Sequence, residues 1–331
     1  MPPGDAPPPH PRGAPDPDNL THSGLASHGH EPVLLGETVE ALKLRPGLTL
    51  VDCTLGRGGH SIAIARRLGP EGLLIALDAD PRNLQFASER VRAELRPGDA
   101  PVRFFHANFA ELVDVLKEVG RPAVDGILAD LGLSTNQLFD PHYGLSFAQP
   151  MPLDMRIDPR LTRTAADLVN SMRENDLANV LYELAQERYS RRIARKIGEA
   201  RRLSPIKSTD RLAELVRSAI PRTGNPRRGG APETIDPATR TFLALRIAVN
   251  REVENLAALL ERAPRALSSG GRLAVISFQS TEDRVVKQAF RSAEAAGLLK
   301  VLTKKPVTPT DEEVAANPRS RSAKLRVAEK C

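Results

Sequence analysis

Between residues 48 and 134, short apolar runs alternate with segments of helical periodicity. The runs are short and aliphatic, whereas the segments between them repeat their apolar residues with a period near that of an α-helix. This alternation predicts parallel strands that are covered by helices on both faces. The expected strands are 48–53, 73–77, 102–105 and 124–131, and the expected helices are 60–68, 83–95 and 110–119.

The alternation ends at Asp140-Pro141, and a Pro- and Asp-rich stretch follows up to Asp158-Pro159. Helical periodicity then continues until about Gly270. We expect Ser171 and Glu174 to form a capping box, and Thr209 to cap a helix over 212–220. Strand-like sequence returns at 270–278 and 324–327. The predicted fold is a Rossmann-like α/β parallel sheet with an inserted helical domain. Its predicted boundaries are 30–140 and 241–331 for the sheet domain and 141–240 for the insert.

Residues 1–29 are predicted to form a disordered tail, because eight prolines precede residue 20 and no apolar stretch of signal-peptide length follows. The tail histidines lack the fixed geometry that a metal needs, so no metal site is expected. No apolar run of about 18 residues predicts a membrane span. Two cysteines, Cys53 in a strand-like run and Cys331 at the end, form no disulfide framework, which fits a reducing cytoplasm.

A glycine-rich loop follows the first predicted strand and opens a helix. Gly56, Gly58 and Gly59 let the backbone approach a ligand where a Cβ atom would collide. Asp78 ends the second predicted strand, where a carboxylate accepts the hydroxyls of an adenosine ribose. Neighbouring strand ends of a parallel sheet therefore carry the elements of a nucleotide-type site.

Two classes of enzyme use such a loop and acid. In a dinucleotide-dependent dehydrogenase, Gly-x-Gly-x-x-Gly places a pyrophosphate on the helix N-terminus. Here the glycines read Gly-x-Gly-Gly, and Asp52 stands just before them. A carboxylate at this point repels a pyrophosphate but suits the cationic methionine end of S-adenosylmethionine. The charge of Asp52 therefore favours a class I methyltransferase, and a dehydrogenase remains the alternative.

The fourth predicted strand ends at Asp130, the only acid in residues 130–134. This strand end faces the expected methyl donor, so we predict that Asp130 contacts the cofactor and also serves the chemical step. Amino-methyltransferases often place Asp, Asn or Ser before Pro-Pro-aromatic here, and this chain matches only the acid. Methylation of cytosine C5 is excluded, because it needs a cysteine nucleophile and neither cysteine is suitably placed.

Ordered motifs run along most of the chain, at 30–35, 52–60, 78–81, 130–134 with Gln137, 152–158, 237–242, 276–284 and 317–322. They cover about residues 30–330 and resemble the ribosomal RNA small-subunit methyltransferase H family. The resemblance implies N4-methylation of a cytidine in the decoding centre of 16S ribosomal RNA, with S-adenosylmethionine as cofactor. It also implies that the helical insert helps to hold the RNA or the small subunit. The cofactor would be lined by Gly58, Gly59, His60, Asp78, Phe109, Asp130 and Gln137.

Within that set, His60 is assigned to binding only, and the ring of Phe109 is expected to pack on adenine. Two positions depart from the family pattern. Gln279 stands where histidine is common, so a required general base at 279 is not expected. Tyr143-Gly144-Leu145 replaces the more usual Arg-Gly-Phe.

The chain carries a net charge of +6, and its basic character is concentrated in residues 188–228, which hold thirteen lysines and arginines against three acids. We predict that this segment docks on RNA phosphates, and a solvated helix face is the alternative. The oligomeric state is left open, with a homodimer among the options. The alternative from a different class is a ribosome assembly factor with a vestigial cofactor fold, which binding of S-adenosylmethionine would argue against.

Overall fold

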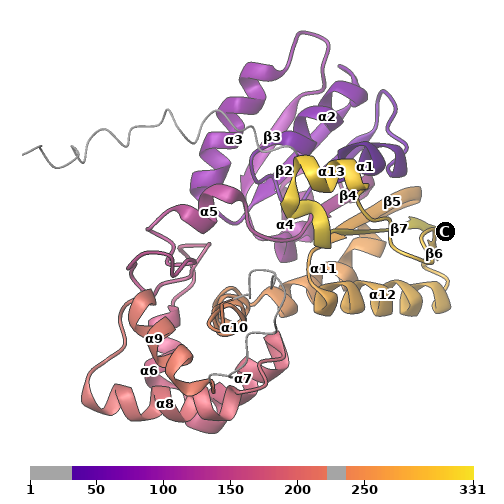
Figure 1. The fold of residues 1–331 in the computed structure, drawn as a ribbon. Coiled ribbons are helices and arrows are strands. Elements are labelled where there is room, and N and C mark those ends of the chain that lie inside the picture. Colours follow the sequence, from indigo (N-terminus) through magenta and orange to yellow (C-terminus); the bar gives the residue numbers. More distant parts are fainter. Residues whose placement is uncertain (1–31, 222–235) are drawn as a thin grey trace, which may run out of the picture. The chain divides into compact units, whose positions relative to one another are not determined.

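The computed structural model describes residues 32–221 and 236–331 (Figure 1). The predicted tail and the basic residues Arg222, Arg227 and Arg228 lie outside these ranges. Within them, seven strands form one sheet in the order β3-β2-β1-β4-β5-β7-β6. The strands are β1 Thr49–Asp52, β2 Leu73–Asp78, β3 Val102–His106, β4 Val124–Asp130, β5 Leu267–Ser277, β6 Leu299–Val301 and β7 Lys324–Lys330.

The strands β3, β2, β1, β4 and β5 run parallel, as the alternating pattern predicts. At the other edge, β7 lies antiparallel to both β5 and β6, so the prediction of a parallel sheet holds only for the first five strands. Strand β6 was not predicted, because its three residues are too few to show a period.

Both faces of the central strands β1, β2 and β4 are buried, which explains why these strands are largely apolar. Alternate residues point to opposite faces: Leu50, Leu74 and Leu128 lie in one core cluster with side chains of α1 and α2. Val51, Ile75 and Ile127 lie in another cluster with side chains of α4, α11 and α12. The helices are α1 Leu35–Ala41, α2 Gly59–Leu68, α3 Pro81–Glu94, α4 Leu112–Val119, α11 Glu252–Ala266, α12 Ser280–Ala295 and α13 Asp311–Ala316, with 3-10 turns η2 Phe109–Glu111 and η3 Pro318–Ser322.

Between β4 and β5 the described chain is helical, and we call residues 135–250 the helical segment. It contains α5 Thr135–Phe139, α6 Ala165–Ser171, α7 Glu174–Ala185, α8 Ser190–Leu203, α9 Thr209–Ala219 and α10 Thr239–Asn250. These helices share a core cluster of their own, whose buried residues run from Tyr143 to Val249. The boundaries 141 and 240 for an inserted domain stay a prediction.

Two helix caps predicted for this segment are wrong. Ser171 is the last residue of α6, and α7 begins at Glu174 after Arg173, without a side-chain cap. Thr209 is the first residue of α9 and does not precede it. Its hydroxyl instead accepts a hydrogen bond from the amide of Met151 at 3.1 Å, which ties α9 to the loop before α6. No helix in the described ranges is long and apolar enough to span a membrane.

Candidate active site

Three acids lie at the carboxyl ends of neighbouring parallel strands. Asp52 ends β1, Asp78 ends β2 and Asp130 ends β4. In the sheet register, Asp52 is paired with Ala76 on one side and with Leu128 on the other, each two residues before the end of its strand. The three carboxyl groups therefore meet at one edge of the sheet, the edge at which such folds bind ligands.

The glycine loop packs against other parts of the protein as well as facing this edge. Gly58 has a φ of +83°, and a Cβ atom there would lie 2.8 Å from Cγ2 of Val91 in α3. A Cβ atom on Gly59 would lie 3.0 Å from the ring of Pro32. Both positions thus need glycine for contacts inside the protein, and their contacts with a cofactor stay predictions.

Asp78 anchors the glycine loop to the end of β2. Its Oδ2 accepts a hydrogen bond from the amide of Gly56 at 2.8 Å, and its Oδ1 accepts one from the amide of Asp80 at 2.8 Å. Burial is the main reason that the pKa of Asp78 is raised to about 7; the two backbone hydrogen bonds lower it in part, and the nearby carboxylates of Asp80 and Asp52 add to the rise. Each oxygen keeps a second lone pair, so the predicted contact with ribose hydroxyls is compatible with this geometry.

Asp130 carries a buried oxygen that is without a partner. Its Oδ1 has no hydrogen-bond partner in the described parts of the chain, and its Oδ2 lies 3.6 Å from Nδ1 of His60. The backbone amide of Asp130 donates to the hydroxyl of Thr54 at 2.7 Å, which fixes the strand end beside the glycine loop. Burial raises the pKa of Asp130 well above its usual value, and the carboxylates of Asp52 and Glu282 add to the effect.

His60 connects this acid to the start of the described chain. Its Nε2 lies 3.1 Å from the carbonyl oxygen of Val33, and because a carbonyl only accepts, Nε2 carries a proton. Its Nδ1 faces Asp130. The structure therefore gives His60 a positioning contact with Asp130, and its predicted contact with the cofactor stays a prediction.

Gln137 takes part in a buried network centred on Asp80. The Nε2 of Gln137 donates to Oδ2 of Asp80 at 2.7 Å, and its Oε1 accepts from the amide of Ser134 at 3.0 Å. The hydroxyl of Tyr143 donates to the same Oδ2 at 2.7 Å, and Oδ1 of Asp80 caps α3 by accepting from the amide of Arg82. The tyrosine that replaces the usual family arginine thus fills a donor position.

Sequence reasoning missed both Asp80 and Tyr143. Asp80 stands immediately before Pro81 at the start of α3, which is a recognisable N-cap signal. No comparable signal marks Tyr143, because its partner lies 63 residues earlier in the sequence.

Removing the hydroxyl of Tyr143 is expected to destabilise the protein. In Tyr143→Phe the buried carboxylate of Asp80 loses one of its charge-assisted hydrogen bonds, which costs about 1.5 to 3 kcal/mol of unfolding free energy. Urea denaturation measures this difference. Tyr182→Phe is the matched control, because Tyr182 is 54% exposed and its loss should change stability by less than about 0.5 kcal/mol. Equal stability of the two variants would contradict the role of Tyr143.

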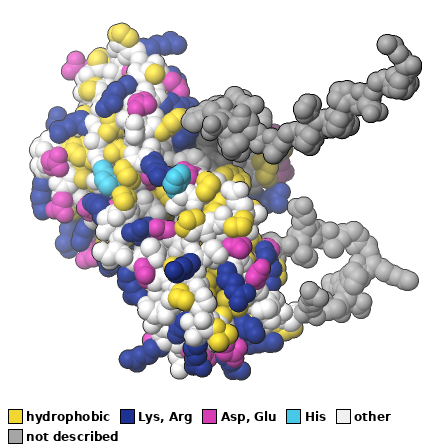
Figure 2. All heavy atoms as spheres, turned by 90° about the vertical axis from the view of Figure 1, so that its left-hand side faces the viewer, with side chains coloured by type: hydrophobic (Ala, Val, Ile, Leu, Met, Phe, Trp, Pro, Cys, Tyr) yellow, Lys and Arg dark blue, Asp and Glu magenta, His cyan; other side chains and the backbone are white. Residues whose placement is uncertain are grey.

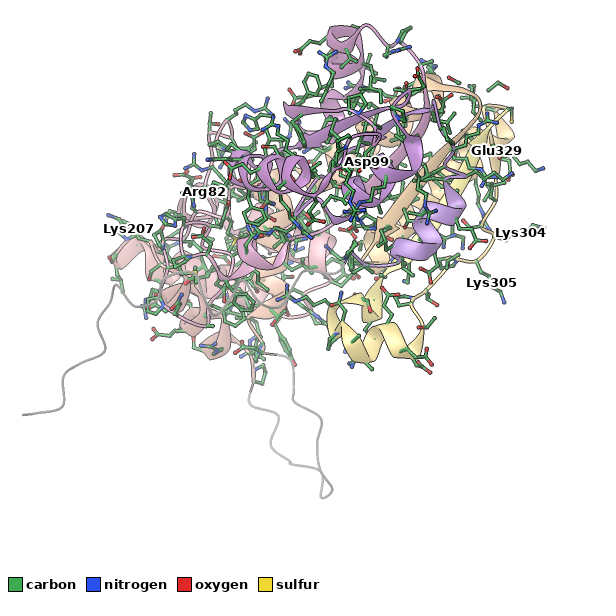
Figure 3. All side chains as sticks on the ribbon, turned by 90° about the horizontal axis from the view of Figure 1, so that it is seen from above. Arg82, Asp99, Lys207, Lys304, Lys305 and Glu329 are labelled. Carbon is green, nitrogen blue, oxygen red and sulfur yellow. The ribbon has the colours of Figure 1, made fainter. Side chains whose placement is uncertain are left out.

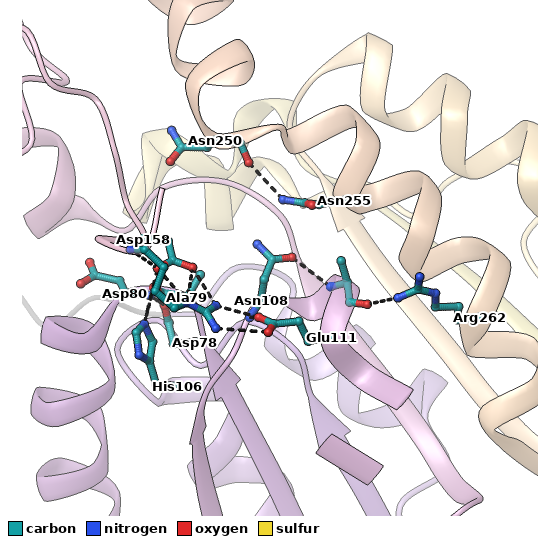
Figure 4. Close-up of polar contacts among 12 residues, drawn as sticks. Asp78, Ala79, Asp80, His106, Asn108, Glu111, Asp158, Asn250, Asn255 and Arg262 are labelled. Atoms are coloured by element: carbon teal, nitrogen blue, oxygen red, sulfur yellow. Dashed lines mark hydrogen bonds and ion pairs between the residues drawn. The ribbon is translucent and has the colours of Figure 1, made fainter. Parts of the chain in front are cut away.

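Phe109 lies in η2, just after β3, and packs half-buried against the core cluster of the sheet. Asn108 and Glu111 form a capping box around this turn. Arg160 of the helical segment bonds to Glu111 of η2 at 2.7 Å. Asp158 lies 3.8 Å from Nε2 of His106, the last residue of β3, so the chain before α6 is held beside the end of β3 (Figure 4). Stacking of Phe109 on adenine stays a prediction.

Gln279 begins α12 as a helix cap. Its side-chain Nε2 donates to Oε1 of Glu282 at 3.0 Å, and its backbone amide donates to Oε2 at 3.0 Å. Burial and the nearby carboxylate of Glu252 raise the pKa of Glu282. The side chain at position 279 is therefore engaged with its own helix. In the described ranges no three His, Cys, Asp or Glu side chains form a group that could hold a metal.

The donor set fits a cationic, hydrogen-bonding ligand. Two buried acids, Asp52 and Asp78, and the partly exposed Asp130 converge on the edge beside the glycine loop. The buried Oδ1 of Asp130 has no partner among the described residues and is available to a ligand. With a parallel sheet that ends in the antiparallel pair β5 and β7, the fold and the site are those of a class I methyltransferase that uses S-adenosylmethionine. The chain belongs to the MraW methylase family, whose model matches residues 27–331.

Curated relatives resemble the chain over nearly its whole length. The Ribosomal RNA small subunit methyltransferase H of Acidobacterium capsulatum is 48% identical over 304 residues, which are 91% of this chain and 98% of that protein. The proteins of the same name from Koribacter versatilis and a Cyanothece species are 47% and 48% identical, over 92% and 91% of this chain and 95% and 94% of theirs. The family, fold class and cofactor predicted from the sequence are confirmed, and the dehydrogenase alternative is excluded.

Proposed function

We propose that this methyltransferase modifies small-subunit ribosomal RNA, and that its target is the exocyclic N4 of a cytidine in the decoding centre. Support for the RNA comes from the relatives, which are named as small-subunit ribosomal RNA methyltransferases. Support for the amine comes from the buried Oδ1 of Asp130, because a target NH₂ group supplies the hydrogen-bond donor that this oxygen lacks among the described residues. The predicted cytoplasmic location accords with such a substrate and stays a prediction.

The residues at this edge would orient and activate the amine. S-adenosylmethionine supplies an electrophilic methyl group. Cytosine N4 is a poor nucleophile because its lone pair is delocalised into the ring, and a hydrogen bond from its N–H to Oδ1 of Asp130 would favour the pyramidal nitrogen that exposes the lone pair. The N4–methyl bond forms as the bond from sulfur to methyl breaks, and N4 then loses one proton. Asp130, held by Thr54 and faced by His60, is placed to accept it.

Nucleoside analysis tests this function directly. Small-subunit RNA from a strain that lacks the gene is digested and examined by mass spectrometry, with the strain complemented by wild-type protein or by Asp130→Asn. We expect N4-methylcytidine to disappear on deletion and to return in full only with the wild type. An unchanged level in the deletion strain would overturn the proposed function. A growth defect rescued equally by both proteins would favour the assembly-factor alternative.

The surface of α8 supports an RNA substrate. Arg188, just before the helix, and Arg191, Arg192 and Arg195 follow the spacing of one helix face, and all four are exposed. Within the described ranges none of the four has a carboxylate at ion-pair distance, although Arg191 donates to the carbonyl oxygen of Asn175 at 3.3 Å. Figure 2 shows Lys and Arg side chains on the lower part of the face it presents, where the helical segment lies.

Other basic residues of 188–228 are already engaged within the protein. Arg211 pairs with Glu214, Arg217 pairs with Asp236, and Arg201 donates to the carbonyl oxygens of Val169 and Met172. We therefore propose the stripe on α8 as the main contact with RNA. Arg202 and Lys207 are exposed and have no ion pair among the described residues, so they stay within the predicted docking segment.

Replacing Arg191, Arg192 and Arg195 by glutamine is expected to weaken RNA binding and to flatten its dependence on salt. Loss of three phosphate contacts should reduce the slope of log K against log salt by about 2 to 3. Fluorescence anisotropy with small-subunit RNA over a range of salt concentrations measures the slope. Arg211→Gln is the control, since Arg211 already pairs with Glu214 and should leave the slope unchanged. A triple variant with the wild-type slope would reject this contact surface.

A further inference from the structure

A second group of arginines lies outside the stripe on α8, and two of them are stacked on exposed aromatic rings. The guanidinium carbon of Arg57, in the glycine loop, lies 3.2 Å from the centre of the Phe86 ring in α3. The corresponding atom of Arg319, in η3, lies 5.5 Å from the centre of the Phe139 ring at the end of α5. Phe86 is 41% exposed and Phe139 is 49% exposed, so both rings are accessible from solvent.

Helix spacing and one ion pair connect the two stacked pairs along one surface. Arg82, Phe86 and Arg90 are spaced four residues apart on α3 and so lie on one face of that helix. Arg82, labelled in Figure 3, pairs with Asp140 at 3.3 Å, and Asp140 directly follows Phe139. We call the surface formed by Arg57, Arg82, Phe86, Arg90, Phe139 and Arg319 the aromatic rim.

The charge of the aromatic rim favours an anionic partner. Arg57 has no carboxylate at ion-pair distance among the described residues, and its neighbour Arg90 is a second cation. Arg90 pairs with Glu94 and also donates to the backbone oxygen of Arg57 at 3.1 Å. Besides Glu94, this face of α3 carries Glu89, which accepts a hydrogen bond from Gln85. A half-buried cation over an exposed ring, beside another cation, matches a phosphate next to a stacked base.

We infer that the aromatic rim binds a single-stranded segment of the RNA substrate. Bases that are already paired and stacked cannot reach isolated rings on a protein surface, whereas unpaired bases stack on exposed phenylalanine and leave their phosphates to arginine. The rim begins at the glycine loop, so a strand held there runs beside the methyl-transfer site. This inference rests on the proposed function only for the origin of the RNA.

The test compares single-stranded with double-stranded RNA. The probe is a fluorescent RNA of about twelve nucleotides and mixed sequence, free or annealed to its complement, a length within the range that such grooves bind. Phe86→Leu and Phe139→Leu should each weaken binding of the single strand at least about fivefold, the lower end for loss of one stacked base. Binding of the duplex should not change in either variant.

Two controls separate stacking from damage to the fold. Phe86→Tyr keeps the ring and should keep the affinity, and Tyr182→Leu removes a similarly exposed ring on α7, outside the rim. Affinity for S-adenosylmethionine is measured in every variant, because Phe86 supports Arg57 of the glycine loop. Wild-type affinity for the single strand in both leucine variants, as expected if the rim binds a protein instead, would overturn the inference.

An equal loss for single strand and duplex would overturn it as well. The outcome is independent of the proposed reaction. If the wild type restores N4-methylcytidine but the leucine variants bind RNA normally, the inferred RNA binding by the aromatic rim is wrong and the proposed function stands. If the leucine variants lose single-strand binding but deletion of the gene leaves N4-methylcytidine unchanged, the proposed function is wrong and the inferred RNA binding by the aromatic rim stands.

Discussion

Asp130→Asn is expected to slow methyl transfer at least about tenfold while retaining part of the affinity for S-adenosylmethionine. Asparagine keeps the size and one acceptor oxygen of Asp130 but removes the charge, and weaker electrostatic stabilisation at the reacting centre costs more than about 1.4 kcal/mol. The structure supports a role in the reaction through Oδ1, which no protein donor in the described ranges satisfies. Single-turnover transfer to small-subunit RNA at saturating cofactor measures the rate.

The pH dependence of the same variant gives a second readout. Burial, with the charges of Asp52 and Glu282, raises the pKa of Asp130, so the ionised form that can accept a proton becomes populated only as the pH rises through this raised value. We therefore expect the wild-type rate to increase with pH over that interval and the rate of Asp130→Asn to be flat. Ala at this position should lower both rate and cofactor affinity further.

Asp125→Asn is the matched control, because Asp125 lies in the same strand near its opposite end and accepts from the amide of Thr49. It should keep the wild-type rate. Wild-type rates in Asp130→Asn would instead leave this residue only its place at the strand end.

Asp78→Ala is expected to weaken binding of S-adenosylmethionine by about 1.5 to 3 kcal/mol, the usual cost of losing hydrogen bonds to a charged partner. Two effects contribute, since the carboxylate is proposed to accept ribose hydroxyls and is shown to hold the amides of Gly56 and Asp80. Calorimetric titration measures the affinity. Asp114→Ala, on the exposed surface of α4, is the control and should bind as the wild type does.

The raised pKa of Asp78, about 7, gives this binding a direction with pH. The protonated acid that prevails at lower pH has lost part of its capacity to accept, so wild-type affinity should be greater at about pH 8 than at about pH 6. Asp78→Ala should lack this increase in affinity between about pH 6 and about pH 8, because it has no carboxyl group to ionise. If Asp78→Ala binds S-adenosylmethionine as tightly as the wild type at both pH values, Asp78 does not contact the ribose.

Hydrophobic patterns in the sequence predicted the positions of most strands. The first four strands, β5 and β7 lie where apolar runs predicted them, because burial on both faces leaves such runs in the sequence. The edge strand β6 and the caps at Ser171 and Thr209 were missed or wrong, since three-residue strands carry no period and cap signals compete with tertiary contacts.

The site could be predicted residue by residue only where each residue lies within a motif. Asp78 and Asp130 stand at strand ends that the sequence marks, and the structure places both at one edge of the sheet. The network of Asp80, Gln137 and Tyr143 depends on contacts between distant segments. For the same reason, the sequence located a basic segment but could not separate the exposed stripe on α8 from arginines that are paired within the protein.

The pairing of β4 with β5 has a consequence for folding during synthesis. Residues 131–266 separate these neighbouring strands, so β1 to β4 and the three acids of the edge leave the ribosome long before β5 can join them. Until β5 is made, β4 is a sheet edge with unpaired backbone groups. Bringing β5 to β4 also closes a loop of residues 131–266, which is slow. We therefore expect the nascent chain to depend on a chaperone in this interval, with independent collapse of the helical segment shortening the wait.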